Sequence, residues 1–109
     1  MNYKVIPTPE FIKNLKILKK KYKNIKSDVL KLANELEKNP TMGVELGKNI
    51  FKIRVKNSDN NRGKSAGYRT ITYSLNEKRE VFLVTIYSKS EKENILGSEL
   101  RELIEKLKS

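Results

Sequence analysis

The N-terminal third of the chain carries hydrophobic residues at a helical spacing. Four of them, separated by four, three and four positions, share one helix face: Phe11, Leu15, Leu18 and Tyr22. The segment Thr8–Glu10 supplies a capping hydroxyl, a proline at the first helical position and a carboxylate at the positive end. We therefore expect a short strand over Tyr3–Ile6 and an amphipathic helix that begins after Thr8.

A second helix is predicted before Asn39-Pro40, because proline disfavours helical backbone in the residue that precedes it. Ser27 or Asp28 can cap its start. Its expected buried stripe has three members, with two more residues at the edges: Leu30, Ala33 and Leu36, then Val29 and Leu32. The two helices are expected to form a hairpin, and Thr41–Lys48, which contains two glycines, is expected to be a loop.

Beyond this loop the hydrophobic period changes to two. Phe51, Ile53 and Val55 alternate with three basic residues, so an extended strand buries the first set and exposes the second: Lys52, Arg54 and Lys56. A turn-forming segment leads into a second strand, Ala66–Leu75. The nearly continuous apolar run Val81–Tyr87 is typical of a central strand that is covered on both faces.

A last amphipathic helix, with Ser90 as its cap, carries four apolar residues on one face: Leu100, Leu103, Ile104 and Leu107. Strands joined by short turns favour an antiparallel sheet. We therefore predict the α+β class, with an antiparallel sheet, an N-terminal helical hairpin packed on one face and a C-terminal helix. We expect residues 1–109 to form a single domain, because a chain of this length has room for one modest core.

Charge narrows the range of partners, because the chain has 24 basic and 13 acidic residues and a formal net charge of +11. This excess indicates an acidic partner, which can be nucleic acid, an anionic membrane or an acidic protein. No apolar run approaches the roughly 18–20 residues of a membrane span, and Met1–Pro7 lacks the apolar core of a signal peptide. We expect a cytoplasmic protein with no membrane partner.

The chain contains no cysteine and no histidine. This composition excludes a thiol nucleophile, a thiolate metal site, a histidine-dependent triad and the usual zinc sites. Any catalysis must therefore use lysine, arginine, tyrosine or carboxylate side chains. We predict neither a metal nor a cofactor.

Seven lysines and no acidic residue lie between Phe11 and Ser27. These lysines can be the solvated face of the first helix, or they can form a row that holds an RNA backbone through its phosphates. Affinity of the second kind is independent of RNA sequence and falls steeply with salt. The lysines of this segment that we assign to RNA binding are Lys16, Lys20 and Lys23.

A second basic group belongs to the predicted sheet. The three basic residues of the 51–56 strand must share one face, and Arg69 begins the next strand. A hairpin can bring Arg69 beside these three residues, and the loop between the two strands adds Arg62 and Lys64. Lys89 follows the next strand and joins the group if that strand pairs with the strand of Arg69. Such a group suits a bound phosphate, whose oxygens accept charge-assisted hydrogen bonds. The alternative is an edge strand protected by charge.

Several segments carry a family resemblance. Three of them hold these cations: Phe51–Arg54 (FKIR), Gly63–Arg69 (GKSAGYR) and Ile86–Glu91 (IYSKSE). The apolar pattern of Phe11–Tyr22 and the segment Leu36–Gly43 fit the same family. In order and spacing these motifs resemble the RelE/ParE toxin superfamily over nearly the whole chain, and most of all its RelE and HigB-like members.

This resemblance implies a RelE-like fold and the toxin half of a type II toxin-antitoxin pair. Such toxins are usually endoribonucleases that cleave mRNA in the ribosomal A site. A cognate antitoxin neutralises them by wrapping the toxin or by displacing part of it. The implied partners are an antitoxin protein, the ribosome and mRNA, and the sequence favours no oligomeric state for the free toxin.

The resemblance also implies roles for individual residues. Lys52 and Arg54 match the family's basic pair, and Arg69 matches its phosphate-binding arginine. Lys89 falls where relatives place a basic or other catalytic residue. Some relatives have a histidine or a late tyrosine in the site, whereas the C-terminal helix of this chain has neither.

The chemistry can also be derived from RNA, whose 2′-hydroxyl is a nucleophile beside the scissile phosphate. A nuclease need only align this hydroxyl, remove its proton, stabilise the charged transition state and protonate the leaving oxygen, and no metal is required. Arg54 and Arg69 suit the phosphate, because a guanidinium binds it with two parallel hydrogen bonds.

Lys52 and Lys56 are the candidates for the base in this reaction. The candidates for the acid are Lys89 and a tyrosine, either Tyr87 or Tyr68. For Tyr87 the alternative is a packing role at the end of its strand.

Two other functions stay open beside the nuclease. One is a ParE-like toxin, which inhibits DNA gyrase by protein contact and needs no cationic catalytic face. The other is a non-catalytic module that binds RNA or the ribosome and does not cleave RNA. The grouped cations favour a ribosome-dependent endoribonuclease. Its predicted catalytic residues are Lys52, Arg54, Arg69, Lys89 and Tyr87, and its predicted RNA-binding residues are Lys56, Lys64, Arg62, Lys16, Lys20 and Lys23.

Overall fold

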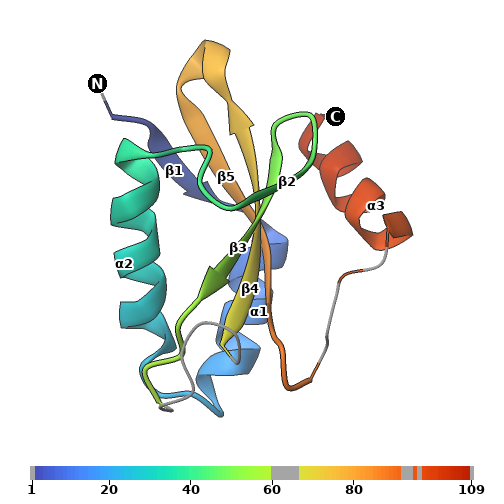
Figure 1. Cartoon of the computed structure of the whole chain (residues 1–109). Helices are drawn as coiled ribbons and strands as arrows, with labels where there is room; N and C mark the ends of the chain where they lie inside the picture. The colour runs from blue at the N-terminus through green and yellow to red at the C-terminus, as the bar shows by residue number, and fades with distance from the viewer. Residues whose placement is uncertain (1, 60–66, 92–94, 96, 109) are drawn as a thin grey trace.

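The computed structural model describes residues 2–59, 67–91, 95 and 97–108. Its elements are β1 (Lys4–Pro7), α1 (Pro9–Lys19), α2 (Ile25–Lys38), β2 (Val44–Gly47), β3 (Ile50–Val55), β4 (Tyr68–Leu75), the 3-10 turn η2 (Asn76–Lys78), β5 (Glu80–Ser88) and α3 (Gly97–Lys108). The strands form one five-stranded sheet in the order β1-β5-β4-β3-β2. In Figure 1, α2 and α3 stand on opposite sides of this sheet, and α1 lies behind the strands.

Helix α1 begins where the sequence predicts. Thr8 precedes it with extended backbone, and the Thr8 hydroxyl oxygen accepts a hydrogen bond from the Phe11 amide at 3.2 Å. The same hydroxyl donates to the backbone oxygen of Val84 on β5 at 3.0 Å. Phe11 and Leu18 are buried, which confirms the predicted apolar face. A single threonine therefore starts the helix and anchors it to the sheet.

Helix α2 buries a different stripe from the predicted one. It begins at Ile25, and its buried residues are spaced by four, three and four positions: Ile25, Val29, Leu32 and Leu36. Leu30 is 62% exposed, and Ala33 is only partly buried. Three of the predicted residues are buried, Leu36 from the stripe and Val29 and Leu32 from its edges. The prediction omits the first helical turn with Ile25, so its centre is shifted toward Leu30. The predicted caps are wrong for the same reason, because Ser27 and Asp28 lie inside that turn.

The sheet is mixed, which corrects the prediction of an antiparallel one. The neighbouring pairs among β2 to β5 are antiparallel, but β1 pairs with β5 in parallel, with Lys4 opposite Glu80 and Pro7 opposite Leu83. Short turns impose antiparallel pairing only on the strands that they join. Two helices and three strands separate β1 from β5 along the chain, so no turn sets its direction.

The segment predicted as a loop contains the edge strand β2. It pairs antiparallel with β3, and the register shifts between Glu45 and Gly47. Val44, Glu45 and Leu46 are all exposed, so this strand has no alternation of buried and exposed residues. Hydrophobic periodicity therefore does not reveal it.

Two hydrophobic clusters cover the two faces of the sheet. The larger joins the buried residues of α1 and α2 to Tyr68 on β4 and to neighbouring strand residues. The smaller joins Ile71 on β4 to Leu103 and Ile104 on α3. Tyr68 and Ile71 are an odd number of positions apart on one strand, so the clusters lie on opposite faces. Helices α1 and α2 thus cover one face, and α3 packs on part of the other (Figure 1).

Helix α3 begins at Gly97, so Ser90 is not its cap. Ser90 instead lies in the turn after β5, where its hydroxyl is 2.8 Å from that of Ser88. The predicted apolar face of the helix is confirmed, because Leu103 and Ile104 are buried.

The orientation of α2 can be tested with two substitutions two positions apart. Leu32 is 3% exposed, and Leu32→Ala should lower the free energy of unfolding by about 2–5 kcal/mol, because it leaves a cavity in the core. Leu30→Ala should change it by less than about 1 kcal/mol, because that side chain is on the surface. Urea denaturation followed by circular dichroism measures both values. Equal losses would show that Leu30 belongs to the core.

Candidate functional site

Three polar side chains form a row across the face opposite α1 and α2. Arg69 on β4 lies between Arg54 on β3 and Tyr87 on β5, and each is directly opposite it in the strand register. Cβ atoms of side chains paired in this way are about 5 Å apart. The neighbouring residues Val55 and Tyr68 point into the larger core cluster, so Arg54 and Arg69 must point away from it. We refer to Arg54, Arg69 and Tyr87 as the cationic row.

Arg69 is almost completely buried, at 4% exposure. Its Nη1 atom donates a hydrogen bond to the backbone oxygen of Tyr68 at 3.2 Å. Burial lowers the pKa of Arg69 from its usual value, and the positive charge of Arg54 lowers it further. A guanidinium that is shielded from water and lies beside a second cation gains more from an anion than an exposed one does.

Two lysines of the same segment flank Arg54: Lys52 within β3 and Lys56 just after its end. Lys52 lies on the same face, opposite Ile71, and is partly buried, whereas Lys56 follows the end of the strand and is exposed. Lys89 follows β5, and its amide donates a hydrogen bond to the backbone oxygen of Gly67 at 3.1 Å. The backbone of Lys89 therefore lies beside the residue that precedes β4, at the same end of the sheet as the cationic row.

The lysines assigned to the first helix lie elsewhere. Lys16 belongs to α1, Lys20 and Lys23 follow it, and all three are exposed. Helix α1 packs against the other face of the sheet, so these lysines come from different elements than the cationic row. Two further predicted residues, Arg62 and Lys64, lie outside the described residues.

The stem of the β3–β4 loop is tied to the start of α2. The carboxylate of Asp59 accepts hydrogen bonds from the Asn24 amide at 3.0 Å and from the Asn24 side chain at 2.8 Å. The carboxylate of Asp28 accepts one from the Ser58 amide at 3.0 Å. Both carboxylates also suit the positive end of the helix. The single acidic residue between Lys52 and Arg69 thus serves the fold.

A groove beside the outer edge of β3 adjoins the cationic row. It has a volume of about 280 Å³ and is lined by residues 53–56 and by side chains of α2 that include Asp28 and Glu35. Its lining therefore carries acidic as well as basic side chains. A cavity of about 330 Å³ lies between the start of α1 and α3, and no predicted site residue lines it. The cationic row is therefore the candidate site.

The row can hold one anionic group and move protons beside it. Arg54 and Arg69 present guanidinium groups, and Tyr87 carries an exchangeable phenolic proton. Among residues 2–59, 67–91, 95 and 97–108, no three or more acidic side chains gather in a way that could hold a metal ion.

Sequence reasoning missed a group of hydroxyls at this end of the sheet. Tyr22, Ser88 and Ser90 bring their side-chain oxygens within hydrogen-bonding distance of one another, although Tyr22 is 66 positions from Ser88. The helical spacing of Tyr22 predicts a packed ring and says nothing about its hydroxyl. No sequence signal links segments this far apart.

A family model matches most of the chain. The model described as the RelE toxin of the RelE/RelB toxin-antitoxin system covers residues 11–108. The chain belongs to the RelE toxin family. A RelE toxin is one component of a toxin-antitoxin system, so membership implies a cognate antitoxin as a partner of this RelE-family chain.

Two solved structures share its fold. One is a free E. coli toxin RelE in which two arginines are replaced by alanine; it has a TM-score of 0.67 and 20% identity, and the match covers 95% of this chain and 99% of the other. The second is the isolated E. coli RelE toxin, with a TM-score of 0.61, 16% identity, and coverage of 96% and 98%. At these identities the likeness concerns the fold, and it agrees with the mixed α+β architecture of this RelE-family chain.

None of the helices in the described part of this RelE-family chain is both long enough and apolar enough to cross a membrane.

Alignment of the cationic row depends on a close backbone approach at Gly67. A Cβ atom at this position would overlap the backbone oxygen of Val55, at the end of β3. Gly67→Ala should therefore force β3 and β4 apart and lower the free energy of unfolding by about 1–3 kcal/mol. Gly97→Ala is the matched control, because a Cβ there meets no atom within 4 Å, and it should leave stability unchanged or raise it by up to about 1 kcal/mol. Chemical denaturation of both variants measures the difference, and a Gly67→Ala protein as stable as the control would refute the close approach.

Proposed function

We propose that this RelE-family toxin is a ribosome-dependent endoribonuclease that cleaves mRNA without a metal, through attack of the 2′-hydroxyl of the RNA. The observation that carries the proposal is the cationic row, in which two guanidinium groups and a phenol stand side by side on one sheet face. Family membership supports it. In this proposal residues 1–109 are a single toxin domain that acts in the cytoplasm.

Arg54 and Arg69 hold the scissile phosphate in the proposed complex. Arg54 is exposed and meets the phosphate first, while the nearly buried Arg69 supports it from the middle of the sheet. Negative charge grows on the phosphoryl oxygens in the transition state, so cations placed beforehand stabilise that state more than the ground state.

The reaction also needs a base and an acid. The base takes the proton of the 2′-hydroxyl while its oxygen bonds to phosphorus, and the acid protonates the oxygen that leaves as the phosphorus–oxygen bond to the next nucleotide breaks. We assign the base to Lys52 or Lys56 and the acid to Lys89 or Tyr87. One product then ends in a cyclic phosphate and the other in a free hydroxyl.

The lysines of α1 and of the segment after it suit a second contact with RNA. Lys16, Lys20 and Lys23 are exposed and belong to α1 and the segment that follows it, whereas the cationic row lies on β3, β4 and β5. We assign them to the phosphates of folded RNA in the ribosome. Such contacts explain why a domain of this size would depend on the ribosome to hold its substrate.

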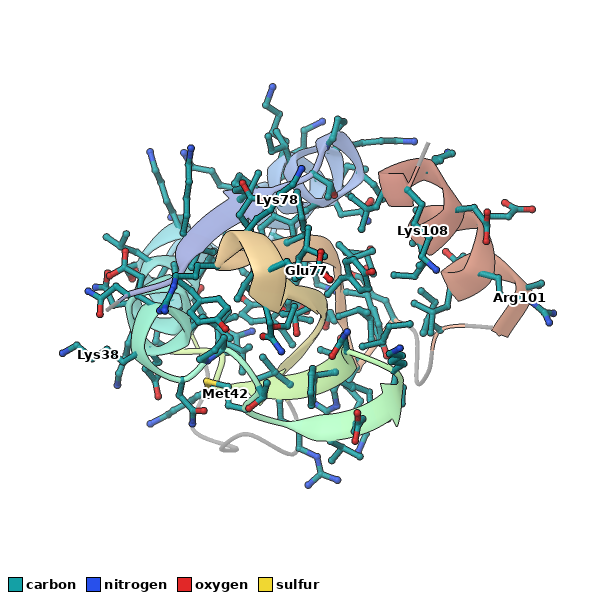
Figure 2. All side chains as sticks on the ribbon, turned by 90° about the horizontal axis from the view of Figure 1, so that it is seen from above. Lys38, Met42, Glu77, Lys78, Arg101 and Lys108 are labelled. Carbon is teal, nitrogen blue, oxygen red and sulfur yellow. The ribbon has the colours of Figure 1, made fainter. Side chains whose placement is uncertain are left out.

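Substitution of the arginines tests the catalytic assignment. Arg69→Ala and Arg54→Ala should each slow mRNA cleavage in a translation extract by at least about 100-fold, because each removes a preorganised donor to the transition state. Arg101→Ala, on the exposed surface of α3, is the control and should stay within about twofold of the unsubstituted toxin. Figure 2 shows Arg101 projecting outward from that helix. Thermal denaturation of each variant reports whether the fold survives.

The same samples separate the three candidate functions. Cleaved mRNA with cyclic phosphate ends supports the proposal. DNA gyrase inhibition without cleavage would identify a ParE-like activity, and ribosome binding without cleavage would identify a non-catalytic module. Cleavage that survives both arginine substitutions would remove the cationic row from the mechanism.

Salt dependence tests the assignment of these lysines. Each phosphate contact should contribute about 0.7 on a single strand and about 0.9 on a duplex to the slope of log affinity against log salt. Replacing Lys16, Lys20 and Lys23 with glutamine should therefore reduce that slope by about 2–3. The control replaces three exposed lysines on separate elements, Lys38, Lys78 and Lys108 (Figure 2), and should reduce it by less than about 1. Ribosome binding over a series of salt concentrations measures both slopes. Equal reductions of the slope in the two triple variants would show that the lysines after Phe11 are an ordinary solvated surface with no special contact to RNA.

A further inference from the structure

Three hydroxyl groups meet at the end of β5. The phenolic oxygen of Tyr22 lies 3.4 Å from Oγ of Ser88 and 3.3 Å from Oγ of Ser90, and the two serine oxygens are 2.8 Å apart. These contacts hold the pKa of Tyr22 below its usual value, with the Ser88 contact having the largest effect. We refer to these residues as the Tyr22 cluster.

The ring of Tyr22 has a separate role in packing. It meets the ring of Tyr68 edge to face, with 5.5 Å between the ring centres, and Tyr68 is completely buried at the start of β4. Tyr22 therefore connects the segment after α1 to the start of β4 through its ring, and to the turn after β5 through its hydroxyl. Removal of the hydroxyl alone leaves the ring contact in place.

The turn that Tyr22 holds contains Lys89. Ser88 and Ser90 flank this lysine in the sequence, and its amide donates to Gly67 at 3.1 Å. The Glu91 amide closes the turn onto the backbone oxygen of Ser88, also at 3.1 Å. A salt bridge of 3.4 Å from Lys21 to Glu91 spans the same two segments, but both side chains are exposed, so it contributes little.

We propose that Tyr22 is a positioning residue whose hydroxyl holds the turn of residues 88–91 in place and, through that turn, sets the position of Lys89. The catalytic part of this inference rests on the proposed function, in which Lys89 is a candidate acid. Tyr22 does not touch the RNA in this scheme. Its effect on the rate arises because proton transfer requires the acid and the leaving oxygen to lie within hydrogen-bonding distance.

Tyr22→Phe tests the inference, because it deletes the hydroxyl and keeps the ring against Tyr68. We expect kcat for ribosome-dependent cleavage to fall about tenfold while KM stays within about twofold, because positioning is lost and binding is kept. Hydrogen exchange of the Lys89 and Glu91 amides should become faster, because the turn opens more often. Ser90→Ala removes a partner of the same hydroxyl and should shift both measurements in the same direction.

Tyr3→Phe is the matched control. Its hydroxyl donates a side-chain hydrogen bond to Asn76 at 2.9 Å, but that contact joins the residue before β1 to the turn after β4, at the opposite end of β4 from the Tyr22 cluster. The control should leave kcat and the exchange of the Lys89 amide unchanged. A loss of kcat as large as that in Tyr22→Phe would overturn the inference.

Two further outcomes would overturn it. One is a Tyr22→Phe protein with unchanged kcat and unchanged exchange at Lys89. The other is a fall in kcat together with a rise in KM and a fall in thermal stability, which would indicate a general weakening of the fold. Amide exchange does not depend on catalysis, so a toxin that cleaves no mRNA would overturn the proposed function and the catalytic part of the inference, while faster exchange in Tyr22→Phe would still support the hold on the turn.

Discussion

Burial of Ile53, Val55 and Tyr68 against α1 and α2 is the contact on which the candidate site depends. Each fully buried side chain of this size contributes about 1.5–3 kcal/mol, so three together outweigh the repulsion between two neighbouring cations near a protein surface, which is at most about 4 kcal/mol. The core therefore decides which way the strands face. Arg54 and Arg69 must then lie side by side on the opposite face, although they repel each other. A bound phosphate removes this cost, which connects the packing of the fold to its proposed chemistry.

The two faces of the sheet divide the functions of the molecule. One face is closed by α1 and α2, whose outer surfaces carry exposed lysines. The other is apolar where α3 packs on Ile71, and polar along the cationic row. In the proposed complex the cationic row holds the substrate strand, and the lysines of α1 and of the segment after it hold folded RNA.

Polar contacts become decisive where the hydrophobic core ends. The strand ends near the cationic row are held by the ties between Asp59 and Asn24, by the close approach at Gly67 and by the Tyr22 cluster. Each such contact is worth about 0.5–1.5 kcal/mol, which matters little beside the total burial of the core. These contacts nevertheless set the geometry of the turns and loop stems that follow the strands, because those segments lie beyond the last buried strand residues, Val55 and Tyr68. Lys89 lies in such a segment, so its placement depends on hydroxyl contacts.

Local patterns in the sequence determined the features that depend on neighbouring residues: the Thr8 cap, the buried face of α1, the alternation along β3 and the α+β class. Tertiary structure alone decided the parallel direction of β1, the presence of β2, the burial of Arg69 and the meeting of Tyr22 with Ser88. The centre of the α2 stripe was predicted at Leu30 and not along Val29 and Leu32, because the first turn of the helix carries no helix signal as clear as that of Thr8. The physical reason is that the spacing of hydrophobic residues describes one segment at a time. Burial and hydrogen bonding depend on which distant segments pack together, and this is decided only when the core forms.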